Sequence, residues 1–255
     1  MNTPRSERIG AAFAAAGDYD RNARIQARAA CQLAARIAAL PLPAGPRVLE
    51  IGCGTGFLTE QMASAGIGGS WLVTDLAPVM LARARARMGD APHRRFAVLD
   101  GERGPVPADA PFDLVAASLA FQWFSDLPAA LRRLSGWLAP GGWLAFTTLA
   151  DGTFTEWREA NLAAGALPGT PPFPDDARLA GMLPGAAVTI EDIPEQHESA
   201  RAFLRAVKAI GAGTPAEGHR PLGAGSLRKA MRHFEAGGGS ATYRLAIVLW
   251  HKPAA

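Results

Sequence analysis

The chain has 255 residues, of which 49% are hydrophobic and 19% charged, and its formal net charge is +3. These values are typical of a globular protein with a substantial core, and they exclude a largely disordered chain. The two cysteines, Cys31 and Cys53, are too few for a disulfide framework or a metal set, and no apolar run is long enough to cross a membrane. We therefore expect a reduced, cytoplasmic protein without a bound metal.

The N-terminal region, residues 1–44, is predicted to be helical, in two pieces that end where a cluster of prolines begins. Tyr19 and Gln26 have two interpretations of equal weight. Either they belong to a lid that closes over a ligand, or this segment only packs on the core. The apolar stripe that would dock the second piece consists of Ile25, Ala29, Leu33 and Ile37.

Residues 47–58 predict a short buried strand, a glycine-rich turn and the start of a helix. The glycines allow a sharp bend and a close ligand, and the helix start leaves unpaired N–H groups beside it. Phe57 stands where the dinucleotide fingerprint has its third glycine, and no Gly-Lys-Ser/Thr follows, which excludes a phosphate-binding P-loop. The pattern predicts a nucleoside cofactor, with a purely structural turn as the alternative. The residues concerned are Glu50, Gly52, Cys53, Gly54 and Gly56.

Strands and helices then alternate, which predicts a parallel, doubly wound sheet over residues 45–150. The helix that Pro78 begins is expected to turn three arginines, Arg83, Arg85 and Arg87, toward solvent. The further strands are expected over 71–75, 96–100, 112–118 and 143–149.

Two predicted strands end in an aspartate at the edge where open sheets bind ligands. Asp75 comes 19 positions after Gly56, which suits a carboxylate that binds ribose hydroxyls, and Asp100 is placed to accept a hydrogen bond from an adenine amino group. This rule applies equally to NAD and to S-adenosylmethionine. The neighbours expected to complete the cofactor site are Leu76, Met80, Gly101, Glu102, Ser118 and Leu119.

The glycine loop, with an acid two residues before it, resembles the first motif of class I S-adenosylmethionine-dependent methyltransferases. Nearly the whole chain is similar to one family of that class, the malonyl-acyl-carrier-protein O-methyltransferases of biotin biosynthesis. The segments that carry this resemblance are Ala12-Phe13, Tyr19-Asp20, the glycine loop, 75–81, 118–123, 146–149, Gly152-Thr153, 205–212 and Thr242-Tyr243.

The resemblance implies a Rossmann-like α/β fold that ends in an antiparallel hairpin, with residues 151–255 supplying a helical substrate cap and the last strands. It also implies methyl transfer from S-adenosylmethionine to the free carboxylate of malonyl-acyl-carrier protein, whose ester product can be elongated toward pimeloyl. Because a carboxylate is already ionised at neutral pH, this chemistry requires positioning and no strong base.

A cation is still needed to hold the acceptor carboxylate. The predicted helix from Ser199 presents Arg201, Arg205 and Lys208 on one face, and we expect Arg205 to orient the malonyl group with Lys208 beside it. Tyr19 is a second catalytic candidate, and Trp123 is interpreted as a wall of the substrate site rather than a catalyst.

A basic cluster later in the chain is a candidate docking patch for the acidic carrier protein, and a generic basic surface is an equal alternative. Its residues are Arg220, Arg228, Lys229 and Arg232. We expect a monomer with no nucleic-acid or membrane partner. The competing hypotheses are a methyltransferase for another small carboxylic acid, an NAD-dependent oxidoreductase and a non-catalytic binding module.

Overall fold

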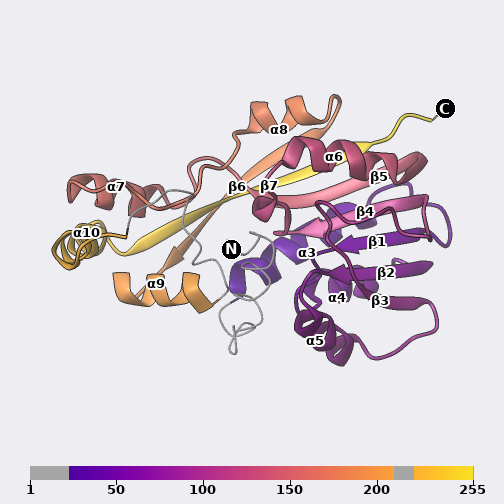
Figure 1. The fold of residues 1–255 in the computed structure, drawn as a ribbon, viewed down its shortest axis with the longest axis horizontal. Helices are drawn as coiled ribbons and strands as arrows, with labels where there is room; N and C mark the ends of the chain where they lie inside the picture. Colours follow the sequence, from indigo (N-terminus) through magenta and orange to yellow (C-terminus); the bar gives the residue numbers. More distant parts are fainter. Residues whose placement is uncertain (1–22, 210–220, 255) are drawn as a thin grey trace, which may run out of the picture.

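The computed structural model describes residues 23–209 and 221–254, which form one mixed sheet with helices on both faces (Figure 1). The seven strands follow the order β3-β2-β1-β4-β5-β7-β6. Neighbours from β3 to β5 pair in parallel, and β7 runs antiparallel to both β5 and β6. The doubly wound sheet with an antiparallel finish is confirmed. Its strands are β1 (Arg47–Ile51), β2 (Ser70–Asp75), β3 (Arg94–Val98), β4 (Phe112–Ser118), β5 (Leu138–Leu149), β6 (Ala187–Gln196) and β7 (Ser240–His251).

The helices divide into two layers and an end group (Figure 1). One layer holds α3 to α5, and the opposite layer holds α6 and α8. The end group consists of α7, α9 and α10, which gather near one end of β7, on the side where the parallel strands finish. The helices are α3 (Arg24–Ala38), α4 (Phe57–Ser64), α5 (Pro78–Met88), the short 3-10 helix η1 (Phe121–Trp123), α6 (Leu127–Gly136), α7 (Thr155–Ala163), α8 (Asp176–Met182), α9 (Ala200–Ala209) and α10 (Ala224–Ala236).

Helix α3 is the second half of the predicted lid, and it docks as its apolar spacing predicts. All four stripe residues are buried, and Leu33 and Ile37 are completely inaccessible. The helix packs on α4 and reaches β5, so it covers the sheet beside the glycine loop. The first half of the predicted lid, which contains Tyr19, lies outside the described residues.

An aromatic cluster joins the end group to the tip of the β6–β7 pair. Phe203 of α9 stacks on Phe234 of α10 at 5.3 Å between ring centroids, and Trp157 of α7 meets Phe234 at 5.7 Å. Tyr243 of β7 reaches the same cluster through Phe154, at 4.7 Å. These contacts hold α7, α9 and α10 together at the tip of the β6–β7 pair. Their role as a substrate cap stays a prediction.

Among the parallel strands, β3 and β5 depart most from the sequence-based expectation. Strand β3 pairs from Arg94 to Val98, so Asp100 lies in the following turn instead of ending the strand. Because β3 is an edge strand, it can begin with two arginines, and these interrupt the apolar pattern from which the start of the strand was predicted. Strand β5 begins at Leu138 instead of Trp143. The additional residues pair with β4 through an irregular step in the register, and the Gly141 N–H donates to the Lys252 carbonyl at 3.1 Å.

Candidate functional site

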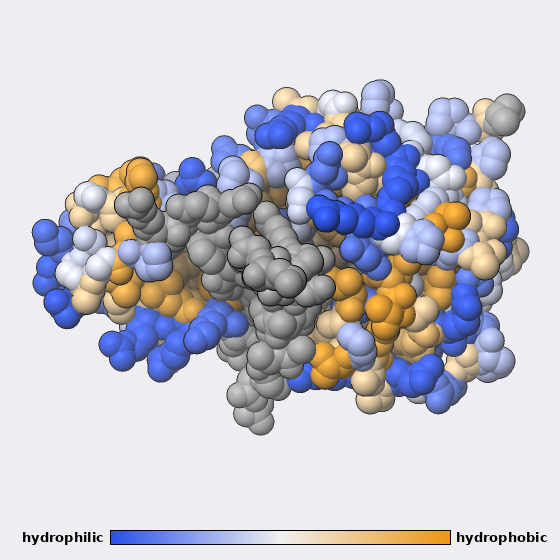
Figure 2. Space-filling model, in the orientation of Figure 1, coloured by the Kyte–Doolittle hydropathy of each residue, from blue (hydrophilic) through white to orange (hydrophobic). Residues whose placement is uncertain are grey.

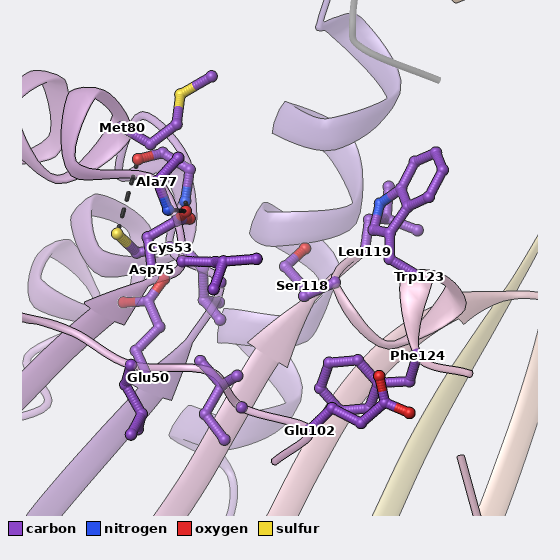
Figure 3. Close-up of a pocket in the computed structure, with 18 of the residues that line it drawn as sticks. Glu50, Cys53, Asp75, Ala77, Met80, Glu102, Ser118, Leu119, Trp123 and Phe124 are labelled. Carbon is purple, nitrogen blue, oxygen red and sulfur yellow. Dashed lines mark hydrogen bonds between the residues drawn. The ribbon is translucent and has the colours of Figure 1, made fainter. Parts of the chain in front are cut away.

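A pocket lies where β1, β2 and β4 end, and α3 closes one side of it (Figure 3). Among the described residues, the predicted cofactor contacts all line it except Gly56, and Trp123 lines it too. Sequence reasoning missed several lining residues that adjoin the predicted ones and could have been found by that adjacency. They are Ala30, Ile51, Thr55, Phe57, Leu58, Ala77, Leu99, Arg103, Ala120, Phe124 and Ser125.

The glycine loop has the tight geometry that its composition predicts. Gly52 and Gly54 adopt φ of 67° and 55°, in the left-handed region that favours glycine. A Cβ atom on Gly52 would lie only 2.6 Å from the Cβ of Ala120, so the loop also touches the segment after β4. Gly56 serves helix packing instead, because a Cβ there would meet Ala84 of α5 at 3.3 Å.

Asp75 is held at the pocket edge by backbone donors. Its Oδ2 accepts from the Gly54 N–H and its Oδ1 from the Ala77 N–H, both at 2.8 Å. Burial raises the pKa of this carboxyl, although the backbone donors oppose the rise. Each oxygen retains a second lone pair. The side chain is therefore fixed in place and can still accept hydrogen bonds from a ligand.

Glu50 lies beneath the glycine loop and is only 1% exposed. The Thr59 hydroxyl donates to its Oε2 at 2.6 Å. Burial is the main cause that raises the pKa of the Glu50 carboxyl to about 7; the nearby Asp75 contributes to the rise, and the hydrogen bond from Thr59 opposes it. Glu50 is thus a buried acid that changes charge near neutral pH, on the border between the core and the pocket.

Asp100 and Glu102 lie in the loop after β3, which begins beside Asp75 because the Leu99 N–H donates to the Asp75 carbonyl at 3.1 Å. Asp100 Oδ1 accepts from the N–H groups of Glu102 and Arg103, at 2.8 and 3.0 Å. Glu102 Oε1 accepts from the N–H groups of Ser125 and Asp126, both at 2.8 Å. The Asp100 bonds order the loop after β3, and the Glu102 bonds anchor that loop to the segment after η1. The predicted adenine contact of Asp100 stays a proposal.

The wall facing the glycine loop comes from β4 and η1. Figure 3 shows Ser118, Leu119 and Trp123 across the pocket from Asp75 and Met80. Trp123 is partly buried, and Phe124 packs on Phe121 at 4.9 Å between ring centroids. This aromatic wall can exclude water from a reaction beside it.

Arg87 corrects the prediction that the arginines of α5 all face solvent. Its Nε donates to the Thr55 carbonyl at 2.8 Å, and its guanidinium lies 4.4 Å from the centre of the Phe57 ring. An ion pair with Glu60 at 3.0 Å completes the arrangement. Helix periodicity alone could not reveal this role, because the partners come from the glycine loop and α4. Arg87 thus supports the loop from behind.

The predicted substrate cations lie away from this pocket. Arg205 and Lys208 are exposed on α9 and do not line it. Tyr19 and Arg220 lie outside the described residues. The assignment of Arg205 to the acceptor carboxylate therefore stays a prediction.

Two negative findings hold for residues 23–209 and 221–254. Nowhere in these segments do three or more His, Cys, Asp or Glu side chains gather as metal ligands would. The helices described there are too short or too polar to cross a membrane.

Comparison with known proteins places this pocket in a methyltransferase context. A family model described as a methyltransferase domain matches residues 48–142. The malonyl-acyl-carrier-protein O-methyltransferase of Magnetococcus marinus is 43% identical over 257 residues, which cover 96% of this chain and 94% of that protein. The biotin biosynthesis bifunctional protein BioCD of Bordetella avium is 46% identical over 241 residues. The match covers 94% of this chain, which spans about half, 51%, of that longer relative.

Solved structures support the fold alone. The YcgJ protein from Bacillus subtilis aligns with a TM-score of 0.59 at 17% identity, over 88% of this chain and 98% of its own. The cyclase SpnF aligns with a TM-score of 0.55 at 21% identity, over 89% of this chain and 83% of its own. Because one of these neighbours is a cyclase, the shared architecture does not determine the reaction.

Proposed function

The chain belongs to the malonyl-acyl-carrier-protein O-methyltransferase family, and we propose that it methylates the free carboxylate of a malonyl group carried by acyl-carrier protein. The Magnetococcus marinus relative, similar over nearly the full length of both chains, supports this acceptor. The pocket at the glycine loop supports S-adenosylmethionine as the donor. The methyl ester would hide the charged end of the malonyl group, so that elongation toward pimeloyl and biotin can follow.

The pocket residues fit the proposed cofactor. We assign the free lone pairs of Asp75 to the ribose hydroxyls and the Asp100 end of the pocket to the adenine. Gly52, Gly54 and Gln26 of α3 all line the pocket and would border the methionine part. When bound there, S-adenosylmethionine supplies an electrophilic methyl carbon.

The protein's part in the reaction is then to position and to dehydrate. The acceptor carboxylate is ionised at neutral pH, so no side chain has to remove a proton. Trp123, Leu119 and Phe124 would exclude water from the carboxylate beside the methyl group. Glu50 and Asp75 already accept hydrogen bonds from the protein, and the remaining lone pairs of Asp75 are assigned to the ribose, so neither is needed as a base.

The carrier protein would dock on α9 and α10. These two helices contain six Lys and Arg residues and one Glu, so the rest of a chain with net charge +3 is net −2. Figure 2 shows hydrophilic residues gathered over both helices. None of the six cations has an ion-pair partner within the described parts of the chain. Such a concentration of positive charge suits an acidic partner. The six are Arg201, Arg205, Lys208, Arg228, Lys229 and Arg232.

Ligand binding and turnover together test the proposed reaction. S-adenosylhomocysteine should raise the melting temperature of the protein, and NAD should not. Methyl transfer should be much faster to malonyl-acyl-carrier protein than to malonyl-CoA or free malonate. Stabilisation by NAD alone would refute the donor, and equal rates with all three acceptors would refute the carrier.

Arg205→Ala separates the two roles open to this residue. If Arg205 holds the malonyl carboxylate, the variant should lose activity with malonyl-acyl-carrier protein and with malonyl-CoA alike. If it contacts the carrier, only the carrier-linked substrate should be affected, through a higher KM.

Charge reversal of Arg228 and Arg232 should raise the KM for malonyl-acyl-carrier protein at low salt, and an unchanged KM would refute the docking surface.

A further inference from the structure

Leu119 has a backbone conformation that needs an explanation. It directly follows β4, lines the pocket and adopts φ of 49°, in the left-handed region that side chains other than glycine rarely occupy. Such a conformation is costly and persists only where the surrounding structure enforces it. The neighbouring residue, Ala120, is the one that leaves no room for a Cβ on Gly52. A shift of this turn would therefore disturb the glycine loop as well.

Thr147 of β5 holds the N–H side of this turn. The Leu119 N–H donates both to the Thr147 carbonyl at 3.1 Å and to its hydroxyl oxygen at 3.0 Å. The Ser118 hydroxyl lies 3.2 Å from the same hydroxyl. Thr147 is completely buried and does not line the pocket, so it can act on a ligand only through Leu119 and Ser118.

Gln122 of η1 holds the carbonyl side. Its Nε2 donates to the Leu119 carbonyl at 2.7 Å. Its Oε1 is buried and has no hydrogen-bond partner among the residues that the structure describes, so the amide serves this one bond. Leu119 is thereby fixed at both polar groups of its backbone by residues from two different elements.

We propose that Thr147 and Gln122 are positioning residues that clamp the Leu119 turn against the glycine loop and so set the width of the methyl-donor site. For binding, the inference requires only the cofactor pocket; for turnover, it rests on the proposed function. Neither Gln122 nor Thr147 lines the pocket, so both would act on the cofactor only through the Leu119 turn.

The chain offers a matched pair of residues for the test. Thr147 and Thr148 are adjacent on β5 and both at most 1% exposed, but the Thr148 hydroxyl is buried without a hydrogen-bond partner in the described structure. Thr147→Val should weaken S-adenosylhomocysteine binding by about tenfold in calorimetry, because it breaks a buried network. Thr148→Val should bind S-adenosylhomocysteine as tightly as the wild type does. Thr147→Ser, which keeps the hydroxyl, should also bind with wild-type affinity.

Kinetics and a second variant complete the experiment. Gln122→Glu keeps the shape of the side chain and replaces its donor with an oxygen, so it should also weaken binding and raise the KM for S-adenosylmethionine more than it lowers kcat. Equal affinities of the two valine variants, or no rescue by serine, would overturn the clamp. Failure of the proposed function would appear differently, as wild-type protein that binds S-adenosylhomocysteine but does not methylate malonyl-acyl-carrier protein.

Discussion

Glu50 should make the stability of the protein depend on pH in a direction opposite to that of an ordinary surface carboxylate. Its pKa is about 7 in the folded protein against 4.5 ordinarily, because burial disfavours the charged form. The folded state therefore binds the proton more tightly than the unfolded chain. The resulting stability is fully present below pH 4.5 and is lost as the pH rises through about 7. The difference between the two pKa values, 4.5 and about 7, corresponds to a free energy of unfolding of about 3 kcal/mol, at about 1.4 kcal/mol per pH unit.

Glu50→Gln isolates this contribution. Glutamine stays neutral at every pH and can still accept the hydrogen bond of Thr59, so the variant should match the wild type at about pH 4 and exceed its stability by up to about 3 kcal/mol at about pH 8. Urea unfolding followed by circular dichroism at both pH values measures the difference. Glu198→Gln, at an exposed position, is the control and should show no such divergence. A difference between Glu50→Gln and the wild type that stays constant with pH would refute the reasoning.

Three further substitutions test the supports of the site. Gly52→Ala should abolish cofactor binding, because its Cβ would lie 2.6 Å from the Cβ of Ala120 and displace the loop. Gly89→Ala, with a similar φ of 68° but no atom within 4 Å of the added Cβ, should cost about 1–3 kcal/mol of stability and leave cofactor binding intact; calorimetry and unfolding compare the two variants. Arg87→Gln should weaken S-adenosylhomocysteine binding about tenfold, because it removes the guanidinium that holds the glycine loop. Arg85→Gln, which removes only an exposed ion pair, should not weaken binding. Equal affinities of the two variants would show that Arg87 does not support the loop. Ser199→Ala should lower the free energy of unfolding by about 1 kcal/mol, since its hydroxyl accepts from the first turn of α9 at 3.1 Å; an unchanged urea midpoint would contradict this cap.

The sequence predicted the parts of the fold that depend on local pattern. The glycine loop, the helix from Pro78 and the strand that ends at Asp75 all follow from spacing and residue type, and the structure confirms them. The start of β3 was missed because Arg94 and Arg95 interrupt the apolar run of an edge strand.

What the sequence could not show are contacts between segments far apart in the chain. Arg87 was expected in solvent, yet it reaches the Thr55 carbonyl, 32 residues away. The Thr147 contact with Leu119 spans 28 residues and depends on the register of β4 against β5. For the same reason the spacing of Arg205 and Lys208 predicted a shared helix face correctly, but it could not show that this face lies outside the pocket.

The position of β7 between β5 and β6 has a consequence for biosynthesis. During translation β6 is completed more than 40 residues before β7 begins, and neither it nor β5 has its antiparallel neighbour until Ser240–His251 leaves the ribosome. Until then two strand edges remain open to pairing with other nascent chains. We expect ribosome-bound chains arrested before Ser240 to need chaperone protection, and the step that inserts β7 to complete the native sheet.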